Sequence, residues 1–289
     1  MSDFLEQVVA ERRAAVDAAK DRTPERQLLA NAKPNLATSA GAAAAHGDAF
    51  TRALLLRKRE GRLAVIAEVK RRSPALGSLD EGVDPAAQAR RYTALGDAWG
   101  ATAISVLTEP LHWGGSFADL AAVRDAVHVP VLCKDVIVSE YQIVQARSAG
   151  ADAVLLIAEA LTDGELQRFT QRARELNMGV LVEAHEPEAF GRAVACGARV
   201  VGANARDLRH PSTIDSTRAR QLHSFVKSEQ IFVAESGIES VDDARLLPSR
   251  VDAVLIGTAL MRADDPAPLI SGIAAIRRTT TVGVTLAER

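Results

Sequence analysis

Cysteine is scarce in this chain, whose 289 residues include Cys133 and Cys196 and no other cysteine. Both lie in apolar stretches and not at the regular spacings of a small disulfide-bonded domain, so a disulfide framework is excluded. We expect both thiols to be reduced, as in a cytoplasmic protein. Cys133 precedes Lys134 in an apolar run, and adjacent strand residues face opposite ways, so Cys133 is predicted to be a core thiol and not a nucleophile.

An excess of charge of either sign is also lacking. The chain has 35 Lys and Arg against 37 Asp and Glu, a formal net charge of −2, and the two signs are interspersed. This balance offers no electrostatic basis for binding nucleic acid or an anionic membrane. No apolar run reaches membrane-spanning length, and the first residues, MSDFLEQVVAERRAAV, contain acids, unlike a secretory signal. We therefore expect no nucleic-acid or membrane partner and a cytoplasmic location.

Two common signatures of bound cofactors and metals are missing. No G-x-G-x-x-G motif follows the first predicted strand, which argues against a dinucleotide site. His185 lies two residues after Glu183, but no third ligand stands at a recognisable spacing, and His185 is better read as part of a helix start. We expect neither a metal nor a cofactor.

Short apolar, β-branched runs recur along the chain, which is 47% hydrophobic. They are continuous and not alternating, as expected for parallel strands covered on both faces. The predicted strands are residues 64–70, 101–107, 129–135, 151–157, 179–184, 199–204, 230–235 and 251–257.

Helical stretches such as residues 139–149, 163–176 and 186–196 separate these runs, and Gly150 and Gly197 stand where helix C-caps belong. Alternating strands and helices over roughly 200 residues predict an α/β protein, a single (β/α)8 TIM barrel. A doubly wound open sheet is the alternative, and the missing dinucleotide motif disfavours it.

Residues 1–60 precede the first predicted strand. They read as helical over 3–20 and 49–59, with an irregular, alanine-rich segment at 34–47 between the helices. We expect this helical extension to cap the barrel formed by residues 61–289, within one structural domain overall.

Polar side chains follow the apolar runs at their carboxyl ends, where (β/α)8 barrels carry their catalytic groups. Glu68 and Lys70 stand two residues apart and so face the same way. The same ends carry Lys134, Glu183, Asn204, Arg206 and Glu235. An edge-strand salt bridge would explain one such pair. Two lysines and three glutamates on one rim carry desolvation costs that indicate a site.

The last two predicted strands are followed by small residues. Ser236 and Gly237 follow one, and Gly257 and Thr258 follow the other and begin a helix. Glycine lets backbone N–H groups approach an anion, and these two loops form the usual phosphate site of the architecture. A phosphate-bearing substrate is therefore the leading interpretation.

Nine stretches, in order, resemble the indole-3-glycerol phosphate synthase family of tryptophan biosynthesis across about residues 64–262. They are AVIAEVKRRSP, AISVLTE with GGSFADL, PVLCKD, YQIVQARSAGADAVLLI, LVEAH, VGANARDL, VAESGI and VLIGTALMR. The resemblance implies a carboxy-lyase that converts 1-(2-carboxyphenylamino)-1-deoxyribulose 5-phosphate to indole-3-glycerol phosphate, carbon dioxide and water.

The resemblance also implies roles for the polar residues. Lys134 would be the acid in ring closure, Lys70 would position the substrate or assist dehydration, and Glu183 would be the base, although the sequence leaves open which lysine performs which step. Glu68 would orient and tune the lysines. The remaining implied substrate contacts are Asn204 and Arg206 for polar groups, Ser73, Ser236, Gly237, Gly257 and Thr258 for the carboxylate or phosphate, and Glu235 and Trp113.

The chain departs from the family at the aryl subsite. Val136 stands where the family usually has phenylalanine after CKD, and Trp113 stands where phenylalanine is common. Our hypothesis is that this exchange of volume reshapes the subsite for a substituted anthranilate moiety, as in a paralogue from a specialised pathway.

Two other functional classes stay open at this point. A barrel isomerase acting on phosphoribosyl anthranilate would need a Cys/Asp acid–base pair at strand ends, whereas this chain offers Glu and Lys. A non-catalytic phosphate-binding barrel would keep the phosphate loops and lose the acid–base residues, whereas both sets are present. The sequence does not define the oligomeric state, and a monomer is compatible with it.

Overall fold

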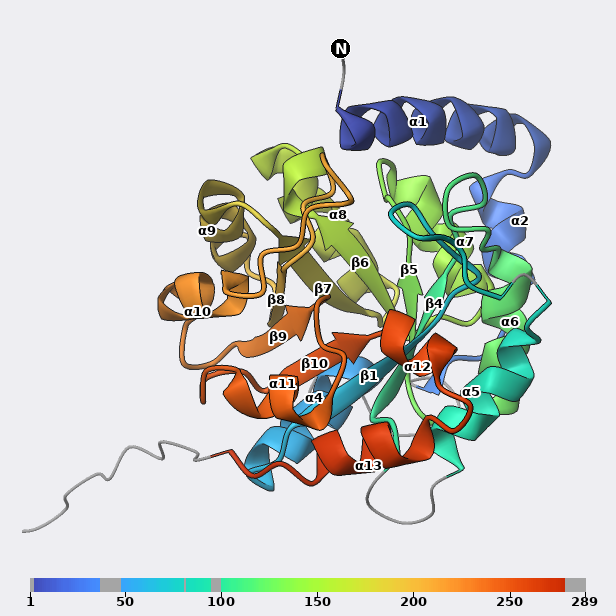
Figure 1. Cartoon of the computed structure of the whole chain (residues 1–289). Coiled ribbons are helices and arrows are strands. Elements are labelled where there is room, and N and C mark those ends of the chain that lie inside the picture. Colours follow the sequence, from blue (N-terminus) through green and yellow to red (C-terminus); the bar gives the residue numbers. More distant parts are fainter. Residues whose placement is uncertain (1–2, 37–47, 81, 95–99, 279–289) are drawn as a thin grey trace, which may run out of the picture.

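Eight parallel strands close into a barrel in the computed structural model, which describes residues 3–36, 48–80, 82–94 and 100–278 (Figure 1). Around the barrel the strands follow the order β1, β10, β9, β8, β7, β6, β5 and β4, and β4 pairs with β1. They are β1 (Ala64–Val69), β4 (Ala103–Leu107), β5 (Val131–Lys134), β6 (Ala153–Ile157), β7 (Gly179–Ala184), β8 (Val200–Asn204), β9 (Ile231–Glu235) and β10 (Ala253–Ile256). Each lies within a predicted range. The predicted (β/α)8 barrel is confirmed, and the open sheet is wrong.

Side chains alternate between the inside and the outside of the barrel. On β1, Ile66 belongs to the apolar cluster inside the barrel, whereas Val65 belongs to the cluster between the strands and the outer helices. Both faces of each strand are thus covered, which explains the continuous apolar runs. Cys133 is fully buried in the outer cluster, and burial raises the pKa of its thiol, so the prediction of a core thiol is confirmed.

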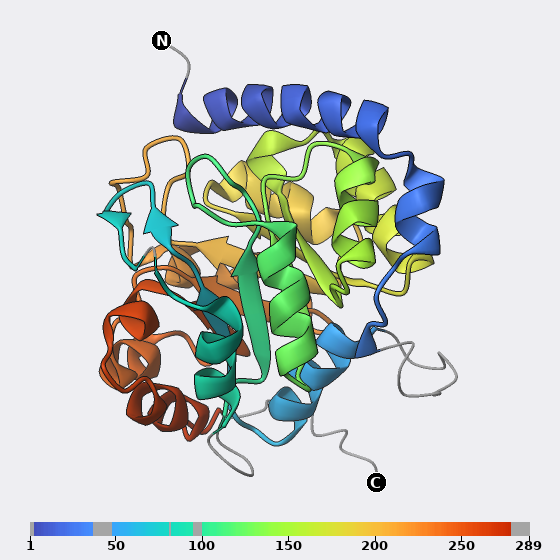
Figure 2. The same cartoon turned by 90° about the vertical axis from the view of Figure 1, so that its right-hand side faces the viewer.

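Helices surround the barrel (Figure 2). They are α5 (Pro85–Thr93), α6 (Phe117–Ala126), α7 (Glu140–Ser148), α8 (Asp163–Glu175), α9 (Pro187–Ala195), α10 (Arg218–Leu222), α11 (Val241–Leu246), α12 (Thr258–Arg262) and α13 (Ala267–Ala274). Of the five helices predicted by range, α7, α8 and α9 are confirmed to within about a residue at each end. The helices predicted over 3–20 and 49–59 are also confirmed, as Phe4–Arg22 and Ala49–Arg59. Within the described ranges, no helix is long and apolar enough to cross a membrane.

The N-terminal helices lie at both ends of the barrel. Helix α1 (Phe4–Arg22) runs across the carboxyl ends of the strands (Figures 1 and 2), where Arg12 pairs with Asp135 at 2.8 Å. Helix α2 (Glu25–Ala30) follows it. Helix α4 (Ala49–Arg59) closes the opposite end, where Phe50 is fully buried in the inner cluster. Residues 37–47 of the predicted irregular segment lie outside the described residues, and the division at residue 60 stays a prediction.

Some short elements were not predicted, because two or three residues show no period. An antiparallel pair, β2 (Arg72–Ser73) and β3 (Gly77–Ser78), lies in the loop after β1. Arg71 ties this loop to α6 by donating to both carboxylate oxygens of Asp119, at 2.5 and 3.0 Å. A 3-10 turn, η1 (Ala158–Ala160), follows β6, and another, η2 (His223–Phe225), follows α10.

Candidate active site

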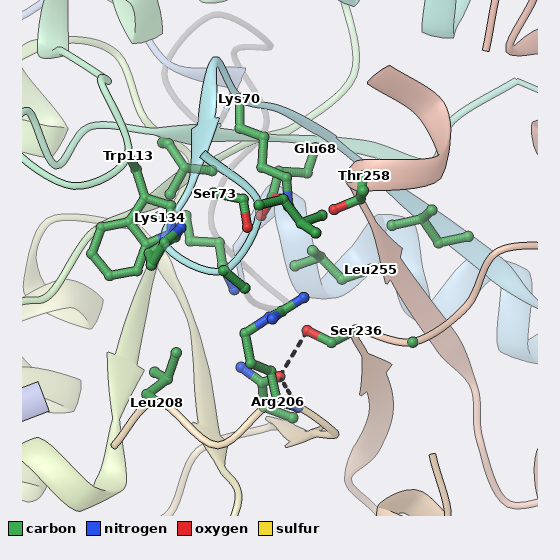
Figure 3. Close-up of a pocket in the computed structure, with 18 of the residues that line it drawn as sticks. Glu68, Lys70, Ser73, Trp113, Lys134, Arg206, Leu208, Ser236, Leu255 and Thr258 are labelled. Atoms are coloured by element: carbon green, nitrogen blue, oxygen red, sulfur yellow. Dashed lines mark hydrogen bonds and ion pairs between the residues drawn. The ribbon is translucent and has the colours of Figure 1, made fainter. Parts of the chain in front are cut away.

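A cavity of about 270 Å³ opens at the carboxyl ends of the barrel strands, as predicted for the site. Twelve of the predicted site residues line it: Glu68, Lys70, Ser73, Trp113, Lys134, Glu183, Asn204, Arg206, Ser236, Gly237, Gly257 and Thr258. The remaining one, Glu235, is 1% exposed and lies beneath the cavity wall against Lys134. Figure 3 shows side chains from different strands pointing toward one space, with Lys70 and Glu68 on one side and Arg206 and Ser236 on another.

Lys134 is held between two buried carboxylates. Its Nζ lies 3.0 Å from Glu183 Oε2 and 3.0 Å from Glu235 Oε2. Burial alone would lower the pKa of Lys134, but these carboxylates raise it above its ordinary value. Burial raises the pKa of Glu235 well above its usual range, and Glu183 adds to this while Lys134 opposes it. The result is a charged ammonium group at the cavity wall, with a protonatable carboxyl group beneath it.

A second ion pair lies on β1 and the loop that follows. Lys70 Nζ is 3.0 Å from Glu68 Oε1, and both side chains are mostly buried. Burial would raise the pKa of Glu68, but Lys70 and Lys134 lower it, so the carboxylate is ionised. This pair lies against Gly257, where a Cβ would be 2.3 Å from Glu68 Oε1. Glycine at this position therefore leaves room for the carboxylate.

Asn204 joins the ends of three strands. Its Nδ2 donates to Glu183 Oε1 at 3.3 Å, and its Oδ1 accepts from Ser236 Oγ at 2.9 Å and from the Arg206 N–H at 3.0 Å. The register aligns Asn204 of β8 with Glu235 of β9. Each end of the Asn204 amide thus has a partner from a neighbouring strand, which fixes its orientation.

Arg206 extends from β8 over the cavity and donates to the carbonyl of Pro211 in its own loop. Burial lowers the pKa of its guanidinium group. Since an arginine remains protonated under physiological conditions, the cavity rim carries a cation beside the Ser236 loop.

Both predicted phosphate loops line the cavity. Ser236 and Gly237 adopt left-handed backbone angles, with φ of 66° and 70°. This conformation is uncommon for serine, and such strain concentrates at functional sites. In the loop after the neighbouring strand β10, Gly257 precedes α12, and Thr258 is the first residue of that helix. Backbone N–H groups of the two loops can therefore approach one anion.

The opposite wall is apolar. It includes Trp113, Val136, Leu155, Ile157 and Leu208. Trp113 contacts Phe4 of α1, with ring centroids 6.0 Å apart and an interplanar angle of 59°. The cavity thus combines an apolar surface with the polar groups, a lining that suits an aryl group.

Sequence reasoning missed Glu109 and Asp135, which also line the cavity. Glu109 is 1% exposed and accepts from the backbone N–H groups of Leu111, His112 and Trp113 at 3.0, 2.7 and 3.1 Å. It lies two residues after the end of β4, as Arg206 lies two residues after the end of β8, so the rule used for the other strand ends would have found it.

The arrangement can move protons at a substrate. A charged lysine can donate to an oxygen on which negative charge develops, and a neighbouring carboxylate can accept a proton from carbon or nitrogen. Across the described residues, no group of three His, Cys, Asp or Glu side chains could hold a metal ion.

Comparison with known proteins gives a consistent result. The profile of the indole-3-glycerol phosphate synthase family matches residues 5–272. A protein of that name from Nocardioides sp. is 51% identical over 220 residues, 76% of this chain and 80% of that protein. Another from Arthrobacter sp. is 46% identical over 84% of this chain and 88% of that protein. Indole-3-glycerol phosphate synthase 2 of Streptomyces coelicolor is 43% identical over 94% of this chain and 99% of that protein.

Solved structures of other proteins share the fold. A tryptophan synthase from M. tuberculosis superposes with a TM-score of 0.56 at 17% identity, over 79% of this chain and 100% of that chain. Thiamine phosphate pyrophosphorylase from Pyrococcus furiosus has a TM-score of 0.53 at 19% identity, over 75% and 95% of the two chains. The profile match over most of the described barrel, together with three relatives above 40% identity, assigns the family: this chain belongs to the indole-3-glycerol phosphate synthases.

Proposed function

We propose that this chain catalyses the reaction of its family, the conversion of 1-(2-carboxyphenylamino)-1-deoxyribulose 5-phosphate to indole-3-glycerol phosphate, carbon dioxide and water. The observation that carries the proposal is the ammonium group of Lys134, held 3.0 Å from both Glu183 and Glu235 at the wall of a cavity with an apolar side. The reaction needs such a proton donor facing an aryl group.

In this proposal, ring closure begins when the aryl carbon attacks the ketose carbonyl carbon. The carbonyl oxygen gains negative charge as the carbon–carbon bond forms, and Lys134 donates a proton to it. The ring carboxylate then leaves as carbon dioxide, and its bonding electrons restore the aromatic ring. Glu183 and Glu235 offset the effect of burial on the pKa of Lys134, so the group is charged before the reaction, which supports this role.

Dehydration completes the reaction. The new hydroxyl group leaves as water after receiving a proton, and a base removes the remaining proton so that the indole forms. We assign the base to Glu183 and the second donor to Lys70, with Glu68 holding Lys70 in place at 3.0 Å. Asn204 orients Glu183 through its amide at 3.3 Å. Glu235, beneath the cavity wall, acts in this scheme by holding Lys134.

We assign the substrate phosphate to the loops after β9 and β10, through Ser236, Gly237, Gly257 and Thr258. The left-handed backbone at Ser236 and the start of α12 at Thr258 support the assignment. Ser73 and Arg206 would contact the substrate's anionic and polar groups, and Trp113 would cover the aryl ring. The substrate is thus a phosphorylated aryl-amino ketose.

The position of Cys133 argues against the barrel isomerase. That chemistry needs a cysteine at the site, and Cys133 faces the outer helices. The buried charges at the cavity argue against a non-catalytic binder, because their desolvation would serve no purpose there.

Two further proposals rest on the family and on the N-terminal helices. Residues 1–60 act as an extension that closes the barrel formed by residues 61–289 from both ends. The chain resides in the cytoplasm, as suits a biosynthetic enzyme, which cell fractionation would test.

An indole-formation assay tests the activity. The wild type should turn over the carboxyphenylamino-deoxyribulose phosphate, and Lys134→Ala should lower kcat by about 10²- to 10⁴-fold, the usual contribution of a general acid. Lys58→Ala is the matched control, because Lys58 also pairs with a buried carboxylate, Asp252 at 3.1 Å, but faces the other end of the barrel. Absence of wild-type turnover would refute the proposal, and unchanged turnover in Lys134→Ala would refute the assigned acid.

A further inference from the structure

His185 lies two residues beyond Glu183, after β7 has ended, and is 6% exposed. It does not contribute to the wall of the substrate cavity; it lines a much smaller hollow on the far side of Asn204. His185 is thus a buried imidazole that lies near the proposed reacting groups but does not line the cavity. Any effect of His185 on the reaction must therefore act through the groups that it contacts.

The partners of His185 indicate its tautomer. Its Nδ1 lies 2.8 Å from the backbone carbonyl oxygen of Asn204, which can only accept, so Nδ1 carries the hydrogen. Its Nε2 lies 2.9 Å from Nη2 of Arg218, which can only donate, so Nε2 presents its lone pair. These contacts favour the tautomer with its proton on Nδ1 and give both ring nitrogens a partner, while Oε1 of Glu186 lies 3.7 Å from Nε2.

The flanking groups hold the imidazole in this orientation. The half-buried carboxylate of Glu159 accepts from the backbone N–H groups of His185 and Glu186, at 2.7 and 3.0 Å. Arg218, at the start of α10, also donates to Gln221 Oε1 at 2.9 Å and lies 3.4 Å from Asp215. The ring thus bridges the end of β7, the end of β8 and α10.

One of the contacts of His185 is with Asn204, the residue that orients the proposed base Glu183. His185 fixes the main chain of Asn204, and the side chain of Asn204 donates to Glu183, which in turn contacts Lys134 at 3.0 Å. We propose that His185, with Arg218 behind it, is a positioning residue that sets the Asn204 amide and through it Glu183. The proposal rests on the proposed function for its effect on rate.

A double-mutant cycle tests the route of the effect. His185→Phe keeps a ring of similar shape and removes both hydrogen bonds. It should lower kcat about 10- to 100-fold, as small displacements of reacting groups do, with KM within about twofold because His185 does not touch substrate. In the Asn204→Ala background the same change should cost less than about twofold, since the amide it positions is already gone. Equal losses in both backgrounds, or no loss in the wild-type background, would overturn the proposal.

Variants of Arg218 test the same hydrogen bond if His185→Phe fails to fold. Arg218 lies nearer the surface, so its substitution should disturb folding less. Arg218→Met should lower kcat in the same direction, and Arg218→Lys should retain more activity because it keeps a donor for Nε2. His210→Phe is the matched control: His210 is bonded to Asp207 in the loop after β8, and its side chain is 69% exposed. It should leave kcat unchanged. A loss in Arg218→Lys as large as in Arg218→Met would contradict the role of the hydrogen bond.

Nitrogen-15 NMR provides a readout that needs no turnover. At neutral pH, His185 should show a protonated Nδ1 and an unprotonated Nε2, and the side-chain amide resonances of Asn204 should shift in His185→Phe. The opposite tautomer, or unmoved Asn204 resonances, would overturn the proposal even if the wild type lacked synthase activity. Absent wild-type turnover with the expected spectra would instead refute the proposed function alone.

Discussion

The carboxyl group of Glu235 occupies the space beside the α-carbon of Gly202 on the neighbouring strand. A Cβ at residue 202 would lie 2.1 Å from Glu235 Oε1 and 3.2 Å from Cδ1 of Leu181. Glu235 is 1% exposed and holds Lys134 at 3.0 Å with its other oxygen. Since the surrounding barrel interior is packed, the carboxyl group cannot yield to a methyl group without pulling away from Lys134.

Gly202→Ala should therefore lower kcat by more than about tenfold, because it displaces the carboxyl group that holds the proposed acid. Steady-state kinetics and thermal unfolding would be measured together. The matched control is Gly191→Ala in α9, where a Cβ meets nothing within 4 Å. Alanine in a helix is favoured over glycine by about 0.5–1 kcal/mol, so this control should be neutral or stabilising and fully active. Full activity in Gly202→Ala would show that Glu235 does not position Lys134.

Asp135 should make stability fall as the pH rises. Burial raises the pKa of Asp135 to about 6 from an ordinary value of 3.8, although Arg12 and Thr108 oppose the shift. Between these two values the folded chain holds a proton that the unfolded chain has lost. The contribution of Asp135 to stability is thus present below about pH 4 and lost by about pH 6, with a slope of at most about 1.4 kcal/mol per pH unit.

Denaturant unfolding of the wild type and Asp135→Asn at several pH values would measure this contribution. The free energy of unfolding of the variant, relative to the wild type, should rise from pH 4 to pH 6 and then level off. Asp125→Asn serves as the control, because Asp125 is an aspartate whose side chain is 63% exposed. A difference that stays constant across this range would mean that Asp135 is ionised throughout.

A substitution at Val136 in the aryl subsite tests the hypothesis that the chain accepts a ring-substituted substrate. Val136 is 3% exposed and lines the cavity together with Trp113. Val136→Phe places a larger side chain in the aryl subsite and leaves less room for a ring substituent. It should therefore lower kcat/KM for a ring-substituted substrate more than for the parent compound. A change of about 1–3 kcal/mol, or roughly 10- to 200-fold, is the range for such fits. Equal effects on both substrates would refute the hypothesis and leave Val136 as a neutral exchange.

The barrel was predictable because its signal is long and repeated. Apolar runs such as residues 64–70 mark strands by composition, and the period of two then assigns Glu68 and Lys134 to the inside without knowledge of the fold. The same rule placed Cys133 outside. The period of two does not predict which side chains from different strands lie close together, because barrel closure and strand register set those distances. The contact of Lys134 with both Glu183 and Glu235 is an example.

Contacts from the N-terminal helices were beyond sequence reasoning. Arg12 lies on an ordinary amphipathic helix, and nothing in its neighbours marks it as the buried partner of Asp135, 123 residues later. The pairing depends on where α1 crosses the strand ends, which is decided by packing of Leu5 and Val8 and not by local sequence. The hydrogen bond between Arg218 and His185 likewise depends on tertiary packing and not on local sequence.

The opposite end of the barrel should govern stability and not catalysis. Phe50 of α4 is fully buried in the inner cluster, which it shares with Ala64 and Leu132 near the amino ends of the strands. Phe50→Ala should lower the free energy of unfolding by about 3–5 kcal/mol, the usual cost of removing a buried phenylalanine. Leu56→Ala on the same helix is the control, since Leu56 is 58% exposed and should change stability by no more than about 0.5 kcal/mol. Because the cavity lies at the carboxyl ends, kcat of Phe50→Ala should match the wild type at temperatures where the variant is fully folded. A lower kcat under those conditions would mean that α4 transmits strain through the barrel to Lys134. It would contradict the prediction that one end of the barrel governs stability and the other catalysis.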